Sequence, residues 1–195
     1  MTKISPLENI HKKGLFGDYA EKAEKDLIKI SEVKDLLIVQ IIQYENSLFP
    51  LKNINIDGLK LDENPLEVKC NNNTRILWQG PKSWILTSTK KNLYKDMLTV
   101  FNKIDFAITD LSNSKTIIEV EGRNSKEILK KGCPFNFNEL KKDICISSTF
   151  NGLSITIDMI EENPNKIRLF SLRSFGESFY ESITDSCLEF GYKNI

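Results

Sequence analysis

Apolar and polar positions along the first half of this 195-residue chain predict strands separated by turn-rich segments. Residues 33–44 are rich in branched apolar side chains and predict a central strand that is buried on both faces. Residues 46–66 contain two prolines and a glycine, so at most a short helix fits there. Two further strands are predicted at residues 75–79 and 83–88, and Gly80-Pro81-Lys82 between them indicates a hairpin.

A helix and a return strand follow, and then a similar order begins again. Apolar side chains every three or four positions predict a helix over residues 90–104, and residues 106–110 predict the return strand. Residues 115–121 alternate between the two faces, as a half-buried strand does. Asn124 and Glu127 are spaced as a capping pair for a short helix.

The last third of the chain predicts a hairpin, a further strand and a long helix. Asn151-Gly152 is a strong hairpin signal, because a type I′ turn needs positive φ at both central residues. The strand after it alternates regularly, and residues 166–172 predict the next strand. Ser174 and Glu177 are spaced as a capping box for the final helix, which Gly191 is expected to end.

The order of these elements predicts an α+β fold with antiparallel sheets. Each half runs strand, short helix, two strands and helix, with a return strand expected only in the first half. This order suits two intertwined ferredoxin-like (split βαβ) units. Residues 1–25 are polar and predict an N-terminal arm. Residues 26–195 then form one compact domain with halves at about 26–112 and 113–195.

Composition narrows the classes of function. The 27 basic and 27 acidic residues cancel, which argues against a nucleic-acid partner because such a protein needs a basic face. The N-terminus contains no apolar run of the kind a signal peptide needs, and no apolar stretch is long enough to span a bilayer. The four cysteines are scattered, which favours a reduced, cytoplasmic protein without membrane contact.

Few residues suggest catalysis. His11 is the only histidine and lies in the polar arm, where it is expected to be solvated, so no Ser-His or Cys-His pair is predicted. Glycine-rich phosphate loops are missing from the sequence, and one histidine with four scattered cysteines does not make a metal site. Neither a catalytic residue, a metal ligand nor a cofactor-binding residue is therefore assigned to this chain, and whether it is an enzyme in its own right stays open.

Three segments together resemble the gamma subunit of heterotetrameric sarcosine oxidase. They are RILWQGPKSWILTS at 75–88, TDLSNSKTIIEVEGRNSKEILKKGCPFNFN at 109–138 and LFSLRSFGESFYESITDSCLEFG at 169–191. Ser5-Pro6-Leu7 also fits the N-terminal arm of that family. The resemblance covers residues 70–191 well and the first third loosely, and it lies in the order and spacing of the segments.

The resemblance implies a subunit that supports assembly and carries no cofactor. In that family FAD, FMN, NAD and tetrahydrofolate are held by other chains, and the partners are the alpha, beta and delta subunits, whose complex oxidatively demethylates sarcosine to glycine. The gamma chain itself is similar to a trimmed folate-binding aminomethyltransferase, such as the T-protein of glycine cleavage. The fold implied is the folate-binding-domain architecture of those enzymes.

An alternative function is a stand-alone folate-binding protein of the same superfamily. Lys131-Gly132-Cys133 also opens a signature of folate-dependent proteins that maintain iron–sulfur enzymes. Here Pro134-Phe135 follows, which departs from that signature and favours the gamma-subunit pattern. Cys133 is then expected to be a packing residue at a helix end.

A subunit needs a docking surface, and two regions are candidates for it. The arm contributes Leu7, Ile10 and Phe16, and the predicted hairpin contributes Trp78 and Trp84. Packing across the hairpin within the chain's own core is the alternative for at least one of the two tryptophans. These five residues are predicted as a possible subunit interface.

Overall fold

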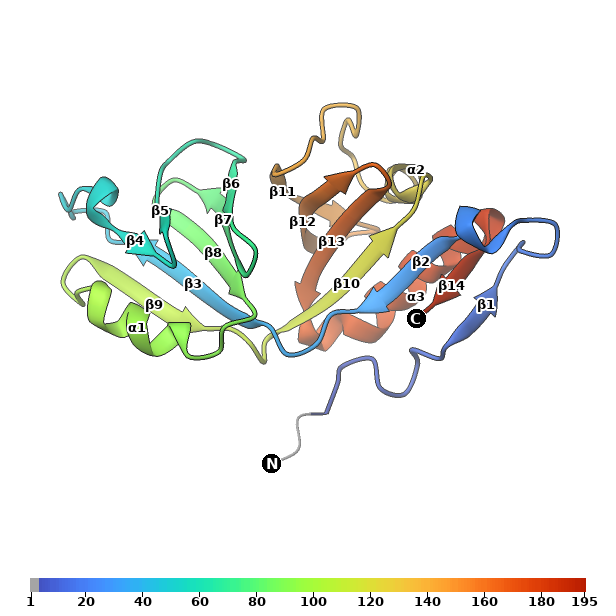
Figure 1. Cartoon of the computed structure of the whole chain (residues 1–195), viewed down its shortest axis with the longest axis horizontal. Coiled ribbons are helices and arrows are strands. Elements are labelled where there is room, and N and C mark those ends of the chain that lie inside the picture. The colour runs from blue at the N-terminus through green and yellow to red at the C-terminus, as the bar shows by residue number, and fades with distance from the viewer. Residues whose placement is uncertain (1–3) are drawn as a thin grey trace. The chain divides into compact units, whose positions relative to one another are not determined.

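The computed structural model describes residues 4–195, which fall into two compact units. Unit 1 contains the described residues up to Lys34 together with Ser114–Lys142 and Ile146–Ile195. Unit 2 contains Asp35–Asn113 and the short return Asp143–Cys145. The chain therefore starts in unit 1, passes through unit 2 and comes back (Figure 1). Residues 26–34 therefore belong to unit 1, together with most of the second half of the chain. The prediction had placed them in the first half, at about 26–112.

Unit 2 is built on a five-stranded antiparallel sheet. Its four longer strands have the spatial order second, third, first, fourth, which is the order of a ferredoxin-like sheet. The sheet, from edge to edge, consists of β6 (Val68–Cys70), β7 (Thr74–Gly80), β8 (Ser83–Ser88), β3 (Leu37–Gln43) and β9 (Phe106–Asp110).

The first crossover of unit 2 departs from the prediction. Residues 46–66 form the 3₁₀ turn η2 (Leu51–Asn53) and a small hairpin of β4 (Asn55–Ile56) and β5 (Leu59–Lys60). Asp57-Gly58 at its tip was a readable turn signal, and Asp57 and Gly58 have φ of 53° and 83°. The second crossover is the helix α1 (Leu93–Val100), as its periodicity predicts.

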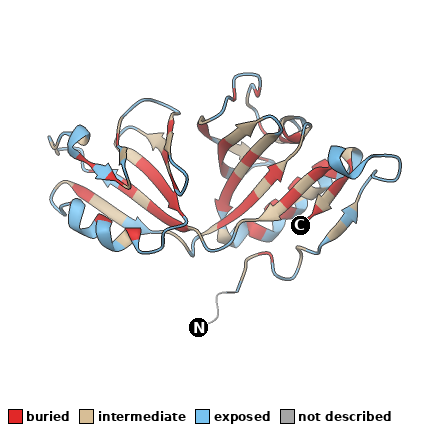
Figure 2. Cartoon of the chain, in the orientation of Figure 1, coloured by how far each residue is buried: buried red, intermediate tan, exposed pale blue. Residues whose placement is uncertain are grey.

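The core of unit 2 lies between its sheet, the hairpin and α1. Alternation along β3 places Val39 and Ile41 on this face, and the four-residue spacing of α1 brings Leu93 and Met97 against them. Trp84 on β8 fills the same core with only 2 % of its surface exposed. Full burial of one such side chain stabilises the fold by about 1.5–3 kcal/mol. Figure 2 shows this buried stripe along the strands.

Unit 1 is built on a seven-stranded sheet that draws on distant parts of the chain. Four of its strands, β14, β10, β13 and β12, have the ferredoxin-like order, and β2 is inserted between β14 and β10. The sheet, from edge to edge, consists of β1 (Gly14–Phe16), β14 (Tyr192–Asn194), β2 (Ile28–Glu32), β10 (Lys115–Glu121), β13 (Asn165–Leu172), β12 (Leu153–Glu162) and β11 (Cys145–Phe150).

A return strand after Gly191 is present, although the sequence did not predict one. Residues Tyr192–Asn194 form β14, which pairs parallel with Ile28–Ile30 of β2. The chain turns into this strand at Gly191, whose φ is 66°. A Cβ at Gly191 would stand 2.5 Å from the carbonyl oxygen of Asp18, so the turn requires glycine. Three residues are too few to show a period of two, which is why the strand was missed.

The predicted N-terminal arm does not extend freely: its described residues, 4–25, pack against the rest of unit 1. Leu7 is 0 % exposed, and β1 pairs antiparallel with β14. The Ser5 hydroxyl donates to the Glu32 carboxylate, and the Asn194 side-chain amide donates to the Lys12 carbonyl at 3.0 Å. Through these contacts the segment becomes part of unit 1, with β1 as the edge strand of its sheet.

Neither predicted helix cap forms its side-chain hydrogen bond. At helix α2 (Ser125–Lys130) the Asn124 side chain accepts no bond from the first-turn amides, and the Glu127 carboxylate accepts from Lys130. Helix α3 (Gly176–Cys187) begins after the 3₁₀ turn η3 (Arg173–Phe175), which contains Ser174 and so removes it from the capping position.

The Asn151-Gly152 turn is confirmed, with φ of 47° and 83°. Two further 3₁₀ turns are η1 (Glu24–Asp26) and η4 (Leu188–Phe190).

Replacement of Leu7 tests whether the N-terminal segment belongs to the core. Leu7→Ala removes a fully buried side chain and should lower the free energy of unfolding by about 2–5 kcal/mol. Leu15→Ala is the matched control, since Leu15 is 40 % exposed in the same segment and its loss should cost far less. Urea unfolding followed by circular dichroism measures both variants. Equal stability of the two variants would contradict the buried position of Leu7.

Candidate functional site

The structure separates the five residues that were predicted as a subunit interface. Leu7 and Trp84 lie within the cores of unit 1 and unit 2, where no area is left for a partner to contact. This corrects their part of the prediction, because apolar side chains of that size are buried by the chain's own sheets. Ile10, Phe16 and Trp78 are half-buried, so their role in an interface stays a prediction.

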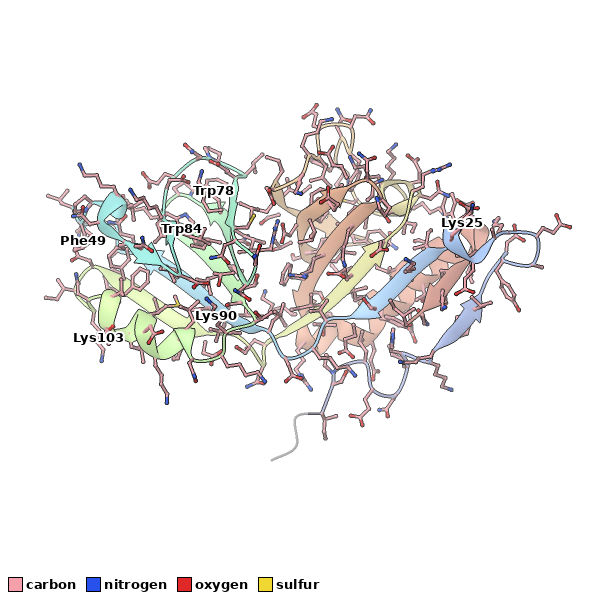
Figure 3. The ribbon with its side chains drawn as sticks, viewed as in Figure 1. Lys25, Phe49, Trp78, Trp84, Lys90 and Lys103 are labelled. Atoms are coloured by element: carbon pink, nitrogen blue, oxygen red, sulfur yellow. The ribbon has the colours of Figure 1, made fainter. Side chains whose placement is uncertain are left out.

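The two tryptophans face each other across the hairpin of β7 and β8. Trp78 and Trp84 are direct partners in the strand register, and both appear on neighbouring strands in Figure 3. The indole Nε1 of Trp84 donates to the Asp62 carbonyl at 2.8 Å, which satisfies its polar atom within the core. Trp78 packs against the same core from a half-buried position. The alternative of packing within the chain is therefore confirmed for Trp84.

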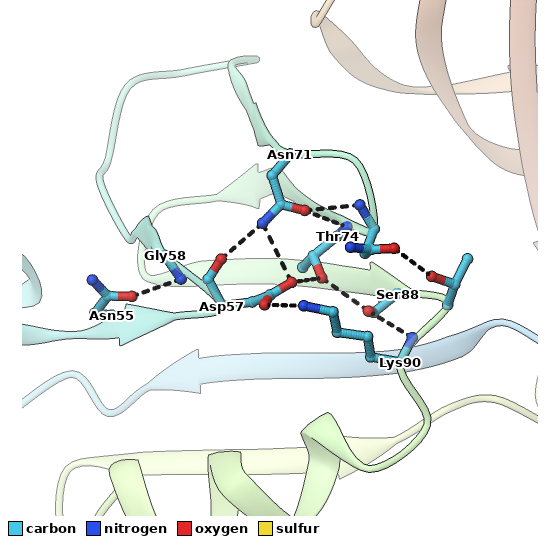
Figure 4. Close-up of polar contacts among 9 residues, drawn as sticks. Asn55, Asp57, Gly58, Asn71, Thr74, Ser88 and Lys90 are labelled. Carbon is cyan, nitrogen blue, oxygen red and sulfur yellow. Dashed lines mark hydrogen bonds and ion pairs between the residues drawn. The ribbon is translucent and has the colours of Figure 1, made fainter.

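A polar cluster around Asp57 connects side chains from several segments of unit 2 (Figure 4). Lys90 Nζ donates to Asp57 Oδ1 at 2.5 Å, and the Thr74 hydroxyl lies 2.7 Å from Asp57 Oδ2. The side-chain amide of Asn71 donates to the Asp57 carbonyl at 2.7 Å. Thr74 Oγ1 also lies 2.8 Å from Ser88 Oγ on the neighbouring strand. The cluster joins the β4–β5 hairpin to the first residue of β7 and the last residue of β8.

These bonds fix the ionisation of Asp57. The bonds from Lys90 and Thr74 hold the pKa of the Asp57 carboxyl below its usual value, against the opposing effect of burial. The carboxylate oxygens of Asp57 accept hydrogen bonds from Lys90 and Thr74, so this side chain links the β4–β5 hairpin to the main sheet. An open surface cavity of about 540 Å³ lies beside it, lined by Asp57, Lys90 and the first residues of α1.

A second polar junction lies in unit 1, where the N-terminal segment meets α3 and β14. His11 Nε2 lies 3.0 Å from the Ile195 carbonyl oxygen, and the His11 ring packs edge-on against Tyr180 at 5.4 Å between centroids. His11 is therefore a packed residue, which corrects the expectation that it is solvated. Burial raises the pKa of Tyr180 to about 12, so its phenol stays protonated at neutral pH. An open cavity of about 330 Å³ adjoins Tyr180 and Asn194.

Two cysteines of unit 1 are buried thiols with little nucleophilic character. Cys133 lies at the end of α2, where its Sγ is 3.1 Å from the Ser148 hydroxyl. Burial raises the pKa of the Cys133 thiol, and it raises that of Cys187 to about 12. Since the thiolate is the reactive form, both groups are suited to packing. The position of Cys133 agrees with the helix-end role that the sequence suggests.

Two carboxylates on strand β10 of unit 1 form ion pairs with basic side chains. Glu119 contacts Lys166 at 2.8 Å and Arg168 at 3.0 Å, and Glu121 contacts Lys29 at 2.8 Å.

Among residues 4–195 no three His, Cys, Asp or Glu side chains are grouped so that they could hold a metal ion. Within the same residues, no helix has the length and apolar character needed to cross a membrane.

Comparison with solved structures identifies two proteins of similar fold. A chain of heterotetrameric sarcosine oxidase from Corynebacterium sp. U-96, in complex with pyrrole 2-carboxylate, superposes with a TM-score of 0.81 at 19 % identity. That match covers 96 % of this chain and 95 % of the other. The glycine cleavage system aminomethyltransferase T from Bartonella henselae superposes with a TM-score of 0.63 at 11 % identity. It covers 93 % of this chain and only 57 % of the longer protein.

The chain has the fold that these two proteins share. The α+β architecture with antiparallel sheets is therefore confirmed, and both groups of proteins named by the sequence resemblance reappear among the structural matches. Protein-family models and curated proteins give no match to this sequence. At these identities the likeness establishes the fold and leaves the activity to be tested.

Replacement of Asp57 tests the polar cluster through pH. Asp57→Asn keeps a residue that tolerates positive φ but removes the charge, and should cost about 1–2 kcal/mol at neutral pH. Because the pKa of Asp57 is lowered by folding, its contribution is complete above the ordinary value of about 3.9 and is lost as pH falls through the lower folded value. The difference in unfolding free energy between wild type and variant should therefore shrink below about pH 4.

Urea unfolding across this acid range measures that difference. Asp26→Asn is the control, since Asp26 is an exposed carboxylate in η1 outside the cluster. Its difference from wild type should stay small at every pH. A wild-type advantage over Asp57→Asn that is unchanged down to about pH 3 would contradict the role of the charge.

The buried thiols predict slow chemical modification. In the folded chain, Cys133 and Cys187 should react with Ellman's reagent at about pH 8 more than about tenfold slower than after unfolding in denaturant. Mass spectrometry of the labelled peptides assigns the rate to each cysteine. Fast labelling of Cys133 in the folded chain would reopen a reactive role for it.

Proposed function

We propose that this chain is a non-catalytic subunit of the gamma type in a multi-subunit sarcosine oxidase. In this role it supports the assembly of the flavin- and folate-binding subunits and does not itself oxidise sarcosine. The observation that carries the proposal is the near-complete mutual coverage with a chain of a heterotetrameric sarcosine oxidase. The three sequence segments that resemble the gamma subunit support the same conclusion independently.

The two structural matches differ in how closely they superpose on this chain. The sarcosine oxidase chain superposes with a TM-score of 0.81, and the aminomethyltransferase with a TM-score of 0.63. The chain spans 57 % of the length of the aminomethyltransferase. The closer superposition supports a subunit of the sarcosine oxidase type over a transferase.

The chemistry of the side chains also favours a structural role. The single histidine is packed between Tyr180 and the C-terminal residue. Cys133 and Cys187 are buried with raised pKa values, and Glu119 and Glu121 are paired with cations across the sheet. Groups committed to such contacts are poor nucleophiles and poor general bases.

Under this proposal the cofactors belong to the partners. FAD, FMN, NAD and tetrahydrofolate would be held by the alpha, beta and delta subunits, and this chain would hold none of them. Its surface would instead be used for permanent contacts, which in obligate complexes bury large and mostly apolar areas. Its two sheets provide the rigid support that such contacts need.

Co-expression with flavin-binding subunits encoded in the same genome tests the proposal. The full chain should co-purify with them as a stoichiometric complex that oxidises sarcosine, because the contacts of an obligate subunit are permanent. The isolated chain should be colourless and inactive with sarcosine. Size-exclusion chromatography with absorbance at flavin wavelengths reads out both results.

Three outcomes would overturn the proposal. Stoichiometric flavin in the isolated chain would make it a redox protein itself. Tight one-to-one binding of tetrahydrofolate to the isolated chain, measured by titration calorimetry, would instead favour a stand-alone folate-binding protein. Failure of the full chain to join a correctly folded set of flavin-binding subunits would also contradict the assembly role.

A further inference from the structure

One exposed turn of unit 1 carries a pair of residues with chemistry of its own. Asn151-Gly152 connects the neighbouring strands β11 and β12, and both residues are exposed. Their φ values are 47° and 83°, so the tip has the left-handed conformation of a tight hairpin turn. An asparagine followed by glycine can close a five-membered ring, in which its side-chain carbonyl carbon is joined to the next backbone nitrogen. The turn is therefore a candidate site of covalent change.

Glycine at position 152 leaves this ring closure unhindered. The attacking atom is the backbone nitrogen of Gly152, and a side chain on that residue would crowd its approach to Cγ of Asn151. A Cβ at Gly152 would have no atom of another segment within 4 Å of it, so the turn is open to solvent on this side. The base that removes the amide proton can therefore come from the solvent.

The Asn151 side chain lacks the bonds that hold its counterpart in unit 2. Asp57-Gly58 forms a turn with closely similar φ values, 53° and 83°. There the side chain accepts hydrogen bonds from Lys90 and Thr74, as Figure 4 shows. Among residues 4–195, no hydrogen bond involves the side-chain amide of Asn151. Two turns of similar backbone shape thus differ in how freely the side chain can rotate toward the next nitrogen.

The turn is docked on the end of helix α2. The Asn151 backbone amide donates to the Gly132 carbonyl at 2.9 Å, and a Cβ at Gly132 would stand 2.6 Å from Asn151 Oδ1. The side chain of Asn151 therefore lies against a residue that has none. Phe150, one residue earlier, is fully buried and packs edge-on against Phe179 of α3 at 6.2 Å between ring centroids. A change in the length of the backbone at Asn151 acts on both contacts.

We propose that Asn151 is a site of spontaneous deamidation. The nitrogen of Gly152 loses its proton to solvent base and attacks Cγ of Asn151, so that an N–Cγ bond forms and the Cγ–Nδ2 bond breaks. Ammonia leaves, and a cyclic imide remains. Water then adds to either carbonyl carbon of the imide, which opens the ring to aspartate or isoaspartate. The net reaction consumes a water molecule and releases ammonia, with no oxidant or reductant.

Both products loosen the turn from α2. The backbone of isoaspartate runs through the former side chain and gains a methylene carbon, whereas a tight hairpin turn fixes the register of its strands. The added length displaces the Asn151 amide from Gly132 and Phe150 from its place in the core. The aspartate product adds a negative charge beside the carboxyl end of α2, where the helix dipole disfavours it. Deamidation therefore destabilises this part of unit 1.

Ageing of the full chain in neutral buffer tests the site. Peptide mapping by mass spectrometry should show Asn151 converted on the order of tenfold faster than Asn113, an exposed asparagine that is followed by serine. The Asn151 peptide should give two products of equal mass, with aspartate and with isoaspartate. Conversion should accelerate as the pH is raised, because base removes the proton of the attacking nitrogen. Equally slow conversion of Asn151 and Asn113 would overturn the proposal.

Two variants separate the effect of the fold from that of the residue pair. Asp57→Asn creates a second Asn-Gly turn whose side chain can still accept from Thr74, and it should convert about three- to tenfold more slowly than Asn151, as a retained hydrogen bond implies. Asn151→Gly keeps a residue suited to positive φ and cannot deamidate, so its urea midpoint should stay constant on ageing while that of the wild type falls.

Two results of these variants would contradict the inference. Conversion at position 57 of the Asp57→Asn chain that is as fast as at Asn151 would show that the hydrogen bonds do not protect the turn. A wild-type urea midpoint that stays constant after isoaspartate has formed would show that the turn is not docked on α2.

Discussion

The parallel pairing of β14 with β2 is the constraint on which the rest of unit 1 depends. It brings Tyr192–Asn194, near the end of the chain, beside Ile28–Ile30, near its start. Strand β1 pairs only with β14, so the N-terminal segment has a sheet edge to join only after β14 is in place. Gly191 makes the turn into this pairing possible, because its backbone closely approaches that of Asp18. Both termini are therefore structural parts of one sheet.

The sequence predicted those elements whose patterns are long enough to read. The alternation of residues 115–121 and the Asn151-Gly152 turn were recovered because one face of each strand is buried and one turn type fits those residues. The segments it missed, β14 and the β4–β5 hairpin, have two or three residues per strand, which carry no usable period. Strand β2 (Ile28–Glu32) was also missed, and its place in unit 1 could not be predicted because non-local pairing leaves no local signal.

Leu7 and Trp84 were wrongly predicted as interface residues for a related reason. Large apolar residues such as Leu7 and Trp84 look the same in sequence whether they fill a core or face a partner. Leu48 and Ile104, in contrast, are 95 % and 88 % exposed, which their residue types do not reveal. The contact of His11 with Tyr180 could not be predicted either, because it depends on the fold of the two termini. In unit 1 the thiols of Cys133 and Cys187 are buried, and the carboxylates of Glu119 and Glu121 are engaged in ion pairs.

Hydrogen–deuterium exchange of the isolated chain and of its complex with flavin-binding subunits tests this account most directly. The amides of β1 and β14 should already be protected in the isolated chain, because they pair with each other. Complex formation should leave this protection of β1 and β14 unchanged, because the pairing lies within the chain. An N-terminal segment that exchanges freely in the isolated chain and becomes protected only when a partner binds would contradict the structural role of the termini.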